Sequence, residues 1–443
     1  MLYTLPIIII GAGPVGLAAA AHLVRKGESF IILESGKEIG ANVLEWGHVK
    51  MFSPWQYNID IASRELLEKA AWNSPGNEEL PTGNELVNDY LIPLSQLPQI
   101  KENLLLNAKV VGITRKGIDK LKNQNRESVP FQVYVEVGDE INVFEARAII
   151  DASGTWKNPN PSLSNGLWTT PERNLKGKIH YGIPNVREME QRYANKTIMV
   201  VGSGHSAINT ILDMAELKEK YPNTAIYWVL RKTNVAAVYG GQENDQLPAR
   251  GELGIRIQKV VESEKINVLT PFYISQLLKE GSHIKVYGEL NGKEFSISNV
   301  DEMIVSTGFR PDTSFLDEVR LNLDEAVESV KAIAPLIDPN FHSCGTVRPH
   351  GEAELRQSEK DFYVVGMKSY GRAPTFLLAT GYEQVRSIVA YMTGDEKGAK
   401  EVQLELPETG VCSTGIINKS AANNSCCGSS ESKIEIITSS CCS

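Results

Sequence analysis

With 443 residues, the chain is long enough for two or three domains, because about 100–200 residues usually form one. Hydrophobic residues make up 42% and charged residues 22%, which is typical of a globular protein with a large core. The formal net charge of −9 argues against nucleic acid or an anionic membrane as the main partner, since both require a basic surface.

The sequence also argues against a membrane-spanning or exported protein. The apolar run 5–10 is interrupted by glycines after about six residues, whereas a spanning helix needs about 20. The N-terminus lacks the basic region, the long apolar stretch and the small-residue cleavage site of a signal peptide. We therefore expect a cytoplasmic protein.

The first predicted unit is a strand, a glycine-rich turn, a helix and a second strand. The short apolar run 6–10 predicts a buried parallel strand, and the alanine-rich run 17–24 predicts a helix. The second strand is predicted at 30–33 and ends at Glu34. A GxGxxG pattern joins the first strand to the helix and contains Gly11, Gly13, Pro14 and Gly16.

Each part of this unit suits a dinucleotide. The first glycine allows a tight turn, the second lets the backbone approach a pyrophosphate, and the third lets the helix pack closely on the strand. The helix N-terminus offers free N–H groups to the anion. Glu34 is placed to accept hydrogen bonds from ribose hydroxyls, and its charge would repel a 2′-phosphate. The site therefore favours FAD or NAD over NADP.

A second unit of the same kind begins at residue 197. The run 197–201 predicts a strand, 208–217 a helix, and 225–230 the next strand. The turn between the first strand and the helix has the accepted GxGxxA variant of the pattern and contains Gly202, Ser203, Gly204, His205 and Ser206. His205 and Ser206 are expected to contact the phosphates of a nicotinamide cofactor.

Two cations follow the second strand of this unit, where the first unit has an acid. Arg231 and Lys232 suit a 2′-phosphate, because arginine pairs with phosphate through charge-assisted, often bidentate hydrogen bonds. The sequence therefore favours NADPH over NADH. The other interpretation, solvated residues after a strand, remains open.

Two further segments would close the two sheets. The run 148–155 is a strand ending in a small-residue turn that includes Gly154, and the run 303–311 is its counterpart, with Thr307 and Gly308. We expect an α/β fold with two Rossmann-like domains. The predicted FAD domain covers 1–165 and 308–395, the inserted NADPH domain covers 166–307, and a flexible cysteine-rich tail covers 396–443.

These segments together resemble the two-dinucleotide-binding flavoproteins, in particular the flavin-containing monooxygenases and their N-hydroxylating and Baeyer–Villiger relatives. The resemblance covers about residues 1–395 and includes the stretch Thr307-Gly308-Phe309-Arg310-Pro311. It implies that Gly366, Thr380 and Gly381 lie at the flavin, where the N-terminus of a helix would stabilise negative charge on the reduced ring. One motif of these families, a phenylalanine, a glycine and a histidine at set spacing, is altered in this chain. The segment 175–181 keeps the glycine and the histidine but has a leucine in place of the phenylalanine, and its spacing is shorter.

The resemblance also implies that the aromatic segment 46–58 passes the flavin ring. Trp46 would then contact the cofactor, Trp55 would form a stacking wall, and Asn58 would contact the ring or the substrate. His48 is the acid–base candidate. Packing in an aromatic core is the other interpretation of this segment.

The cysteines are confined to the end of the chain. None precedes Cys344, so the core lacks the dithiol that disulfide reductases carry beside the flavin. The tail contains two vicinal pairs, Cys426-Cys427 and Cys441-Cys442, which suit a soft metal or metalloid because thiolate is a soft ligand. Such a tail is similar to that of mercuric reductases and to flavoproteins associated with arsenic resistance. A tail without function is the alternative.

Taken together, the sequence favours an FAD-containing, NADPH-dependent monooxygenase that uses molecular oxygen to oxidise a small, soft nucleophile, with a possible link to arsenic. A second hypothesis is an NADPH-dependent reductase of a metal, metalloid or disulfide that uses the tail thiols. A third, non-enzymatic hypothesis is a redox-sensing or thiophilic-ion-binding flavoprotein.

Overall fold

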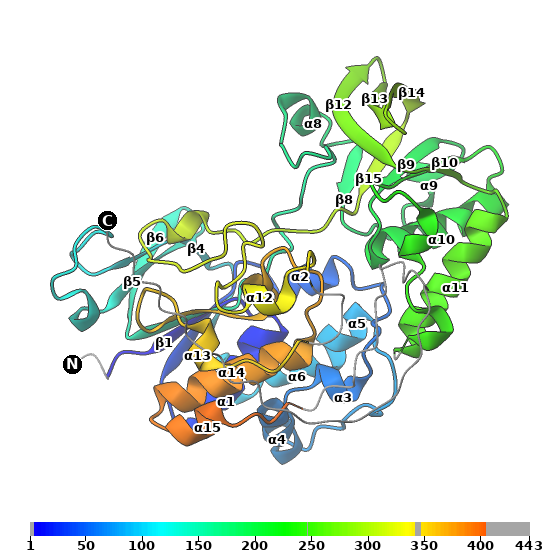
Figure 1. Ribbon diagram of the computed structural model, residues 1–443. Coiled ribbons are helices and arrows are strands. Elements are labelled where there is room, and N and C mark those ends of the chain that lie inside the picture. The colour runs from blue at the N-terminus through cyan, green and yellow to red at the C-terminus, as the bar shows by residue number, and fades with distance from the viewer. Residues whose placement is uncertain (1–3, 246, 342–346, 405–443) are drawn as a thin grey trace, which may run out of the picture.

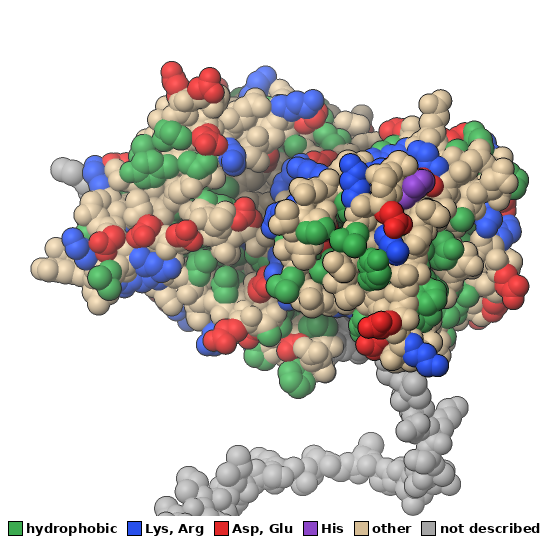
Figure 2. Space-filling view, turned by 90° about the horizontal axis from the view of Figure 1, so that it is seen from above, with side chains coloured by type: hydrophobic (Ala, Val, Ile, Leu, Met, Phe, Trp, Pro, Cys, Tyr) green, Lys and Arg blue, Asp and Glu red, His purple; other side chains and the backbone are tan. Residues whose placement is uncertain are grey.

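The computed structural model describes residues 4–245, 247–341 and 347–404. Two lobes, each built on a parallel sheet, are joined by two extended connections (Figure 1). Seen from above, Lys and Arg side chains are intermingled with Asp and Glu over the surface (Figure 2). In the described ranges no helix has the length and apolar character needed to cross a membrane. The α/β fold class is confirmed.

The first sheet has five parallel strands in the order β16-β7-β1-β2-β3. Its strands are β1 (Ile7–Ile10), β2 (Phe30–Leu33), β3 (Leu104–Leu105), β7 (Ala148–Asp151) and β16 (Phe362–Val364). The four isoleucines of β1 are at most 5% exposed, because strands flank it on both sides and helix α1 (Pro14–Lys26) packs over it. Helix α14 (Leu378–Met392) packs against α1. This apolar strand anchors the turn that follows it.

The second sheet repeats this arrangement, in the order β11-β10-β9-β15-β8. Its strands are β8 (Ile179–Tyr181), β9 (Thr197–Val201), β10 (Ala225–Val229), β11 (Asn267–Leu269) and β15 (Glu302–Val305), all parallel. Helix α10 (His205–Lys220) follows β9, and α11 (Pro248–Glu262) packs beside α10. The strands expected at 30–33 and 197–201 have the expected bounds, whereas α1 and α10 each extend beyond the expected helices by several residues.

Each unit inserts a three-stranded antiparallel sheet before the strand that closes it. In the first unit the inserted strands are β4 (Lys109–Arg115), β5 (Phe131–Val137) and β6 (Glu140–Ala146). In the second they are β12 (Phe272–Glu280), β13 (His283–Leu290) and β14 (Lys293–Val300). Four strands of the two sheets therefore correspond in order, whereas the outer strand comes last in the first sheet (β16) and first in the second (β8). Each closing strand, β7 or β15, lies directly beside the strand that leads into a glycine turn.

Short helices occupy the remaining connections. They are α2 (Ala41–Leu44), α3 (Trp55–Asn58), α4 (Ile61–Lys69), α5 (Gly83–Glu85), the π-helix η2 (Leu86–Leu91), α6 (Ile92–Ser95), α7 (Pro98–Lys101), η3 (Arg126–Ser128), α8 (Thr170–Asn174), α9 (Glu190–Tyr193), η4 (Val235–Val238), η5 (Gln242–Asn244), η6 (Ser314–Leu316), α12 (Ala334–Ile337), α13 (Glu352–Leu355), η7 (Gly366–Tyr370) and α15 (Glu396–Lys400).

The two connections between the lobes pair with each other. Pro159 and Phe309 form an antiparallel bridge, and Asn160 N–H donates to the Gly308 carbonyl over 2.9 Å. The Asn160 side chain donates to the Thr307 carbonyl over 3.1 Å, and the Thr307 hydroxyl lies 3.2 Å from the Asn160 carbonyl. Thr307 and Gly308 therefore lie in a paired linker between the lobes.

The first residues of the predicted flexible tail pack against α14. The expectation of flexibility from residue 396 is wrong for the residues up to 403, which fold back onto α14. Asp395 caps α15, and Arg386 of α14 donates to the Gly398 carbonyl over 2.7 Å. The Ser387 hydroxyl donates to the Ala399 carbonyl over 2.6 Å. Sequence periodicity could not detect these contacts, because they are polar and use backbone carbonyls.

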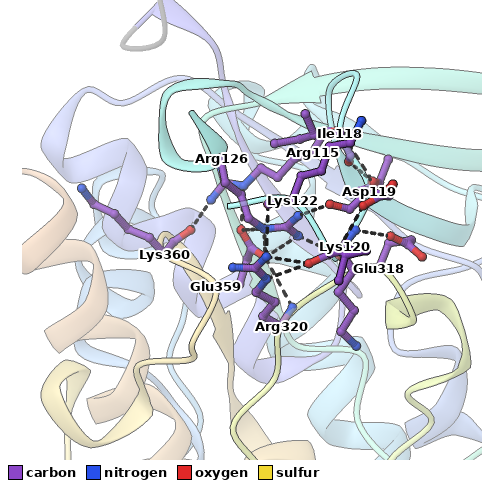
Figure 3. A network of polar contacts seen from close by, with 12 residues as sticks. Arg115, Ile118, Asp119, Lys120, Lys122, Arg126, Glu318, Arg320, Glu359 and Lys360 are labelled. Carbon is purple, nitrogen blue, oxygen red and sulfur yellow. Dashed lines mark hydrogen bonds and ion pairs between the residues drawn. The ribbon is translucent and has the colours of Figure 1, made fainter. Parts of the chain in front are cut away.

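A buried ion cluster ties the β4–β6 sheet to the chain that returns from the second lobe (Figure 3). Glu359, with its side chain 2% exposed, accepts a hydrogen bond from Arg115 Nε over 2.8 Å and one from Arg126 Nη2 over 2.7 Å. Burial alone would raise the pKa of Glu359, but the hydrogen bonds from Arg126 and Arg115 outweigh burial and hold the pKa below its ordinary value.

Glu359→Gln should destabilise the protein by about 3–5 kcal/mol at pH 7, because two guanidinium groups would remain buried without a counter-charge. The folded-state pKa is lowered, so the contribution of the carboxylate is present above the unfolded pKa and is lost as pH falls through the folded one. Urea unfolding should therefore show a wild-type advantage at pH 7 that shrinks below about pH 4.3.

The matched control is Glu280→Gln. Its side chain is 55% exposed and lies 3.7 Å from Lys285, so we expect a change of about 0–1 kcal/mol. Equal effects of the two substitutions would show that the buried cluster does not stabilise the fold.

Candidate nucleotide-binding sites and the junction between them

The first glycine turn is enforced by backbone contacts at two of its three glycines. Gly11 has φ +96°, and a Cβ atom there would lie 2.9 Å from the carbonyl oxygen of Ala152, just beyond β7. A Cβ atom on Gly16 would overlap the carbonyl oxygen of Gly11. The protein itself therefore requires glycine at both positions, whatever the turn binds.

Gly13 is different, because nothing in the described protein requires it. Its φ is −80°, which any residue can adopt, and a Cβ atom there would meet no atom within 4 Å. Gly13 lies before α1, whose first turn begins with Pro14 and has no side-chain cap. Gly154, beyond β7, has the same open space where a Cβ would lie. The open space in front of an uncapped helix N-terminus fits a pyrophosphate.

Glu34 lies directly against this turn. It is 8% exposed, and its Oε2 accepts a hydrogen bond from Ala12 N–H over 2.7 Å. Its Oε1 accepts another from Gly36 N–H over 2.7 Å. The carboxylate is thus fixed at the end of β2, and each oxygen retains capacity to accept a hydroxyl hydrogen bond. This arrangement fits the expected ribose contact.

The second turn repeats the geometry of the first. Gly202 has φ +135°, and a Cβ atom there would overlap the carbonyl oxygen of Ser306, beyond β15. Gly204 precedes α10 without a side-chain cap, and a Cβ atom there would meet nothing within 4 Å. Ser203 and Ser206 are half-buried beside it. The second turn therefore offers the same open cradle for a phosphate.

The two predicted phosphate-binding cations follow β10. Arg231 is exposed, and its Nη1 donates to the Ser164 carbonyl over 3.1 Å. Lys232 Nζ donates to the Ala237 carbonyl over 3.0 Å. Both side chains are held by neutral backbone acceptors in these contacts, so a phosphate would supply a stronger, charge-assisted partner.

The predicted flavin contacts of the C-terminal segment converge on α1. Gly366 has φ +67°, and its N–H donates to Oε1 of the buried Gln384 over 2.8 Å. Thr380 and Gly381 lie in the first turn of α14, where a Cβ on Gly381 would lie 2.6 Å from Val15. Gly381 thus lets the start of α14 approach α1 at the first glycine turn.

The segment after α2 meets both linkers in an aromatic junction. Trp156 stacks on Phe309 with ring centroids 4.4 Å apart, and its Nε1 donates to Glu45 Oε2 over 2.7 Å. Trp46 lies 6.4 Å from Trp156 between centroids. Neither Glu45 nor Trp156 was predicted from the sequence as a site residue, although the position of Trp156 two residues after Gly154 is a usable signal.

His48 and His205 lie where the lobes touch. The pKa of His48 is lowered by burial, and its Nε2 is buried with no hydrogen-bond partner among the described residues. The ring of His205, at the second glycine turn, lies 4.9 Å from that of Phe52 between centroids. Burial, with Arg192 nearby, also lowers the pKa of His180 to about 4. His48 and His180 are therefore neutral near pH 7 and can act as bases or hydrogen-bond partners.

Trp55 and Asn58 are buried in the core of the first lobe. Trp55 is 3% exposed within the main hydrophobic cluster. Asn58 is 1% exposed, and its amide donates to the carbonyls of Ser53 at 2.6 Å and Pro54 at 3.2 Å. Trp55 therefore packs in the hydrophobic core, and the Asn58 side chain pairs with nearby backbone carbonyls. Their contact with flavin or substrate stays a prediction.

The predicted soft-metal ligands Cys426, Cys427, Cys441 and Cys442 lie outside the described residues, as does Cys344. Within 4–245, 247–341 and 347–404, no group of three or more His, Cys, Asp or Glu side chains could hold a metal ion.

Comparison with known proteins agrees with this geometry. The family model described as "Pyridine nucleotide-disulphide oxidoreductase" matches residues 8–332. A ferredoxin–NADP reductase from Lactobacillus gasseri is 24% identical over 339 residues, which cover 76% of this chain and 84% of that protein.

Two solved structures share the fold. The bacillithiol disulfide reductase of Bacillus cereus superposes with a TM-score of 0.63 at 19% identity, covering 88% of this chain and 99% of that one. The FAD-bound cadaverine monooxygenase of desferrioxamine biosynthesis from Erwinia amylovora superposes with a TM-score of 0.61 at 11% identity, covering 93% and 100%.

Gly13→Val should abolish FAD binding without unfolding the protein, because a Cβ atom at this position meets no protein atom within 4 Å and the side chain would occupy the space that we assign to the pyrophosphate. The measurement is flavin released per mole of purified protein, with circular dichroism and thermal unfolding to report the fold. Gly177→Val is the matched control, since a Cβ atom there also meets nothing within 4 Å and lies away from the turn.

Gly16→Val should behave in the opposite way and fail to fold, since its Cβ would overlap a backbone oxygen. A folded Gly13→Val variant with full FAD content would contradict the assignment of this turn.

Proposed function

Since the chain belongs to the pyridine nucleotide-disulphide oxidoreductase family, we propose that it is an FAD-containing, NADPH-dependent monooxygenase of a small, soft nucleophile. The observation that carries the proposal is the pair of matching turns, in which Gly13 and Gly204 each leave open space before an uncapped helix. Two such cradles in one chain provide for two nucleotides.

The first cradle suits FAD. The N–H groups at the start of α1 and the space at Gly13 would hold the pyrophosphate, and Glu34 would hold the ribose. When bound, FAD supplies the redox chemistry, and the protein supplies orientation and electrostatics. Gly366 and the start of α14 at Thr380 and Gly381 would face the ring, where the helix N-terminus favours negative charge.

The second cradle suits NADPH. Gly204 and the first turn of α10 would hold its pyrophosphate, and Arg231 with Lys232 would pair with the 2′-phosphate. The ferredoxin–NADP reductase named above is a relative that uses NADP according to its name. The aromatic junction around Trp156 would shield the region between the two cofactors from water.

Oxygen is the acceptor that fits the sequence best. No cysteine precedes Cys344, so the core has no dithiol to take electrons from the flavin. The fold shared with the cadaverine monooxygenase supports this choice. A reductase is the second candidate, supported by the names of the ferredoxin–NADP reductase and the bacillithiol disulfide reductase.

The substrate class is a small, soft nucleophile, and a trivalent arsenical is the member of this class that thiolates also bind. We propose that the vicinal cysteines of the tail deliver a trivalent arsenical or a similar soft species, which links the enzyme to metalloid detoxification. Thiolate formation is needed for this contact, so it weakens as pH falls well below about 8.5.

The test is NADPH oxidation and oxygen uptake by the FAD-loaded protein, measured with thioethers, amines and trivalent arsenicals, in air and under anaerobic conditions. A monooxygenase should consume oxygen and NADPH in equal amounts, and only when the right substrate is present. Anaerobic turnover with a disulfide or metal ion would replace the proposal with the reductase. A variant ending at Glu408 enters the same assay, and the arsenic link fails if its response to arsenicals equals that of the full chain.

Arg231→Ala should lower kcat/KM for NADPH by about 10- to 100-fold and leave NADH almost unchanged, because a hydrogen bond between charged groups contributes roughly 1.5–3 kcal/mol. Arg187→Ala is the control, since that side chain is also exposed and pairs with Glu216 on the same lobe. An unchanged ratio of NADPH to NADH activity would exclude Arg231 as the phosphate ligand.

A further inference from the structure

Two arginines from distant segments face a single carboxylate. Arg310 lies on the second linker, and Arg372 lies between η7 and α14. Arg310 Nη2 is 3.6 Å from Glu328 Oε1, and Arg372 Nη1 is 3.9 Å from the same oxygen. The three side chains are 31–41% exposed. The cluster therefore carries one excess positive charge at a position that solvent can reach.

The hydrogen-bonding capacity of these arginines is unused. Both distances to Glu328 exceed a hydrogen bond, and among the described residues neither guanidinium donates one. Arg310 Nε is buried without any partner in that part of the chain. Arg126 shows the contrast, because its guanidinium donates to Glu359 and to the carbonyls of Asp119 and Glu318 over 2.7–2.9 Å. The guanidinium of Arg126 is thus paired by hydrogen bonds, whereas those of Arg310 and Arg372 are not paired in this way with any described residue.

The backbone holds the cluster firmly in place. Arg372 N–H donates to the Val327 carbonyl over 2.7 Å, and Arg310 N–H donates to the Asn158 carbonyl over 2.8 Å. Glu328 has φ +58° at the end of a turn in which Asp324 Oδ1 accepts the N–H of Val327 over 2.8 Å. Backbone hydrogen bonds therefore hold the main chain of both arginines in place.

The cluster also lies where the segments assigned to the flavin meet. Arg310 follows Phe309, which stacks on Trp156 of the junction. Arg372 lies two residues after the end of η7, which begins at Gly366, and shortly before the start of α14. A molecule held by these arginines would lie beside the proposed redox site.

We propose that Arg310 and Arg372 bind an anionic group of the substrate, a carboxylate or a phosphate, and that Glu328 takes the place of this group when the site is free. Guanidinium groups pair with both anions in a planar, bidentate way, which explains two arginines with unused donors. This inference rests on the proposed function and deepens it, since the substrate would carry an anionic group in addition to its soft nucleophilic centre.

The test is calorimetric titration of the FAD-loaded protein with sodium phosphate and, separately, sodium acetate, at constant ionic strength. Arg310→Ala and Arg372→Ala should each weaken binding of the preferred anion by roughly 10- to 100-fold. Glu328→Gln should tighten it, because the competing carboxylate is removed, and a misfolded variant could not produce a gain. Arg25→Ala is the matched control, with a side chain 42% exposed and 3.3 Å from Glu65.

Absence of binding to the wild type, or equal affinity in the arginine variants, would overturn the proposal. Titration in the presence of saturating NADP⁺ separates the two sources of phosphate, and loss of anion binding there would assign the arginines to the nucleotide instead of the substrate. NADPH-dependent oxygen uptake by the same protein is read separately, with the thioethers, amines and arsenicals of the substrate screen. Absence of uptake with every one of them, with anion binding intact, would refute the monooxygenase and leave the anion site standing.

Discussion

The architecture depends on two backbone crossings that leave no room for a side chain. At each one, the turn that leaves the central strand passes against a carbonyl of the neighbouring closing strand, Gly11 against Ala152 and Gly202 against Ser306. A Cβ atom at either glycine would meet that carbonyl, so both turns require glycine before any ligand is considered. The contact lies just beyond the ends of strands that are far apart in sequence and pair in parallel, β1 with β7 and β9 with β15.

The position of the two sites relative to each other depends on the linkers. The pairing of Pro159 with Phe309 and the stacking of Trp156 on Phe309 join the two connections into one antiparallel ribbon. The hydrogen bond from Trp156 Nε1 to Glu45 Oε2 attaches this ribbon to the segment after α2. The contact of Phe52 with His205 then brings the first lobe to the second glycine turn. The open carboxyl ends of both sheets are thereby placed beside one junction, which is where ligands bind in such folds.

Much of the fold could be predicted from the sequence because its signals are local. A β-branched run followed by a GxGxxG or GxGxxA turn identifies β1 and β9, and the steric demands on Gly11, Gly16 and Gly202 explain why that pattern is reliable. The junction could not be predicted in the same way, since Glu45 and Trp156 are 111 residues apart and only the fold brings them together.

Segment 46–58 shows the limit of a composition argument. Its aromatic and amide side chains, with the family resemblance, predict contacts with the flavin, and packing was the other interpretation. Trp55 is buried in the core and the Asn58 amide donates to nearby carbonyls, while the contact with flavin stays a prediction. The start of the tail was misplaced because α15 is held by side-chain contacts to backbone carbonyls, such as that of Ser387 with Ala399, which leave no hydrophobic periodicity. Hydrophobic periodicity predicts apolar faces of helices and strands, and it cannot predict a helix that is held by hydrogen bonds to backbone carbonyls.

The central claim is that NADPH on the second turn reduces FAD on the first directly, without a cysteine. The test uses a variant that contains no cysteine, because it carries Cys344→Ser and ends at Glu408. Its FAD-loaded form is mixed rapidly with NADPH under anaerobic conditions, and reduction of the flavin is followed by absorbance. The account predicts that the flavin of this variant is bleached stoichiometrically and as fast as in the full chain. A flavin that stays oxidised, while the full chain is reduced, would contradict it.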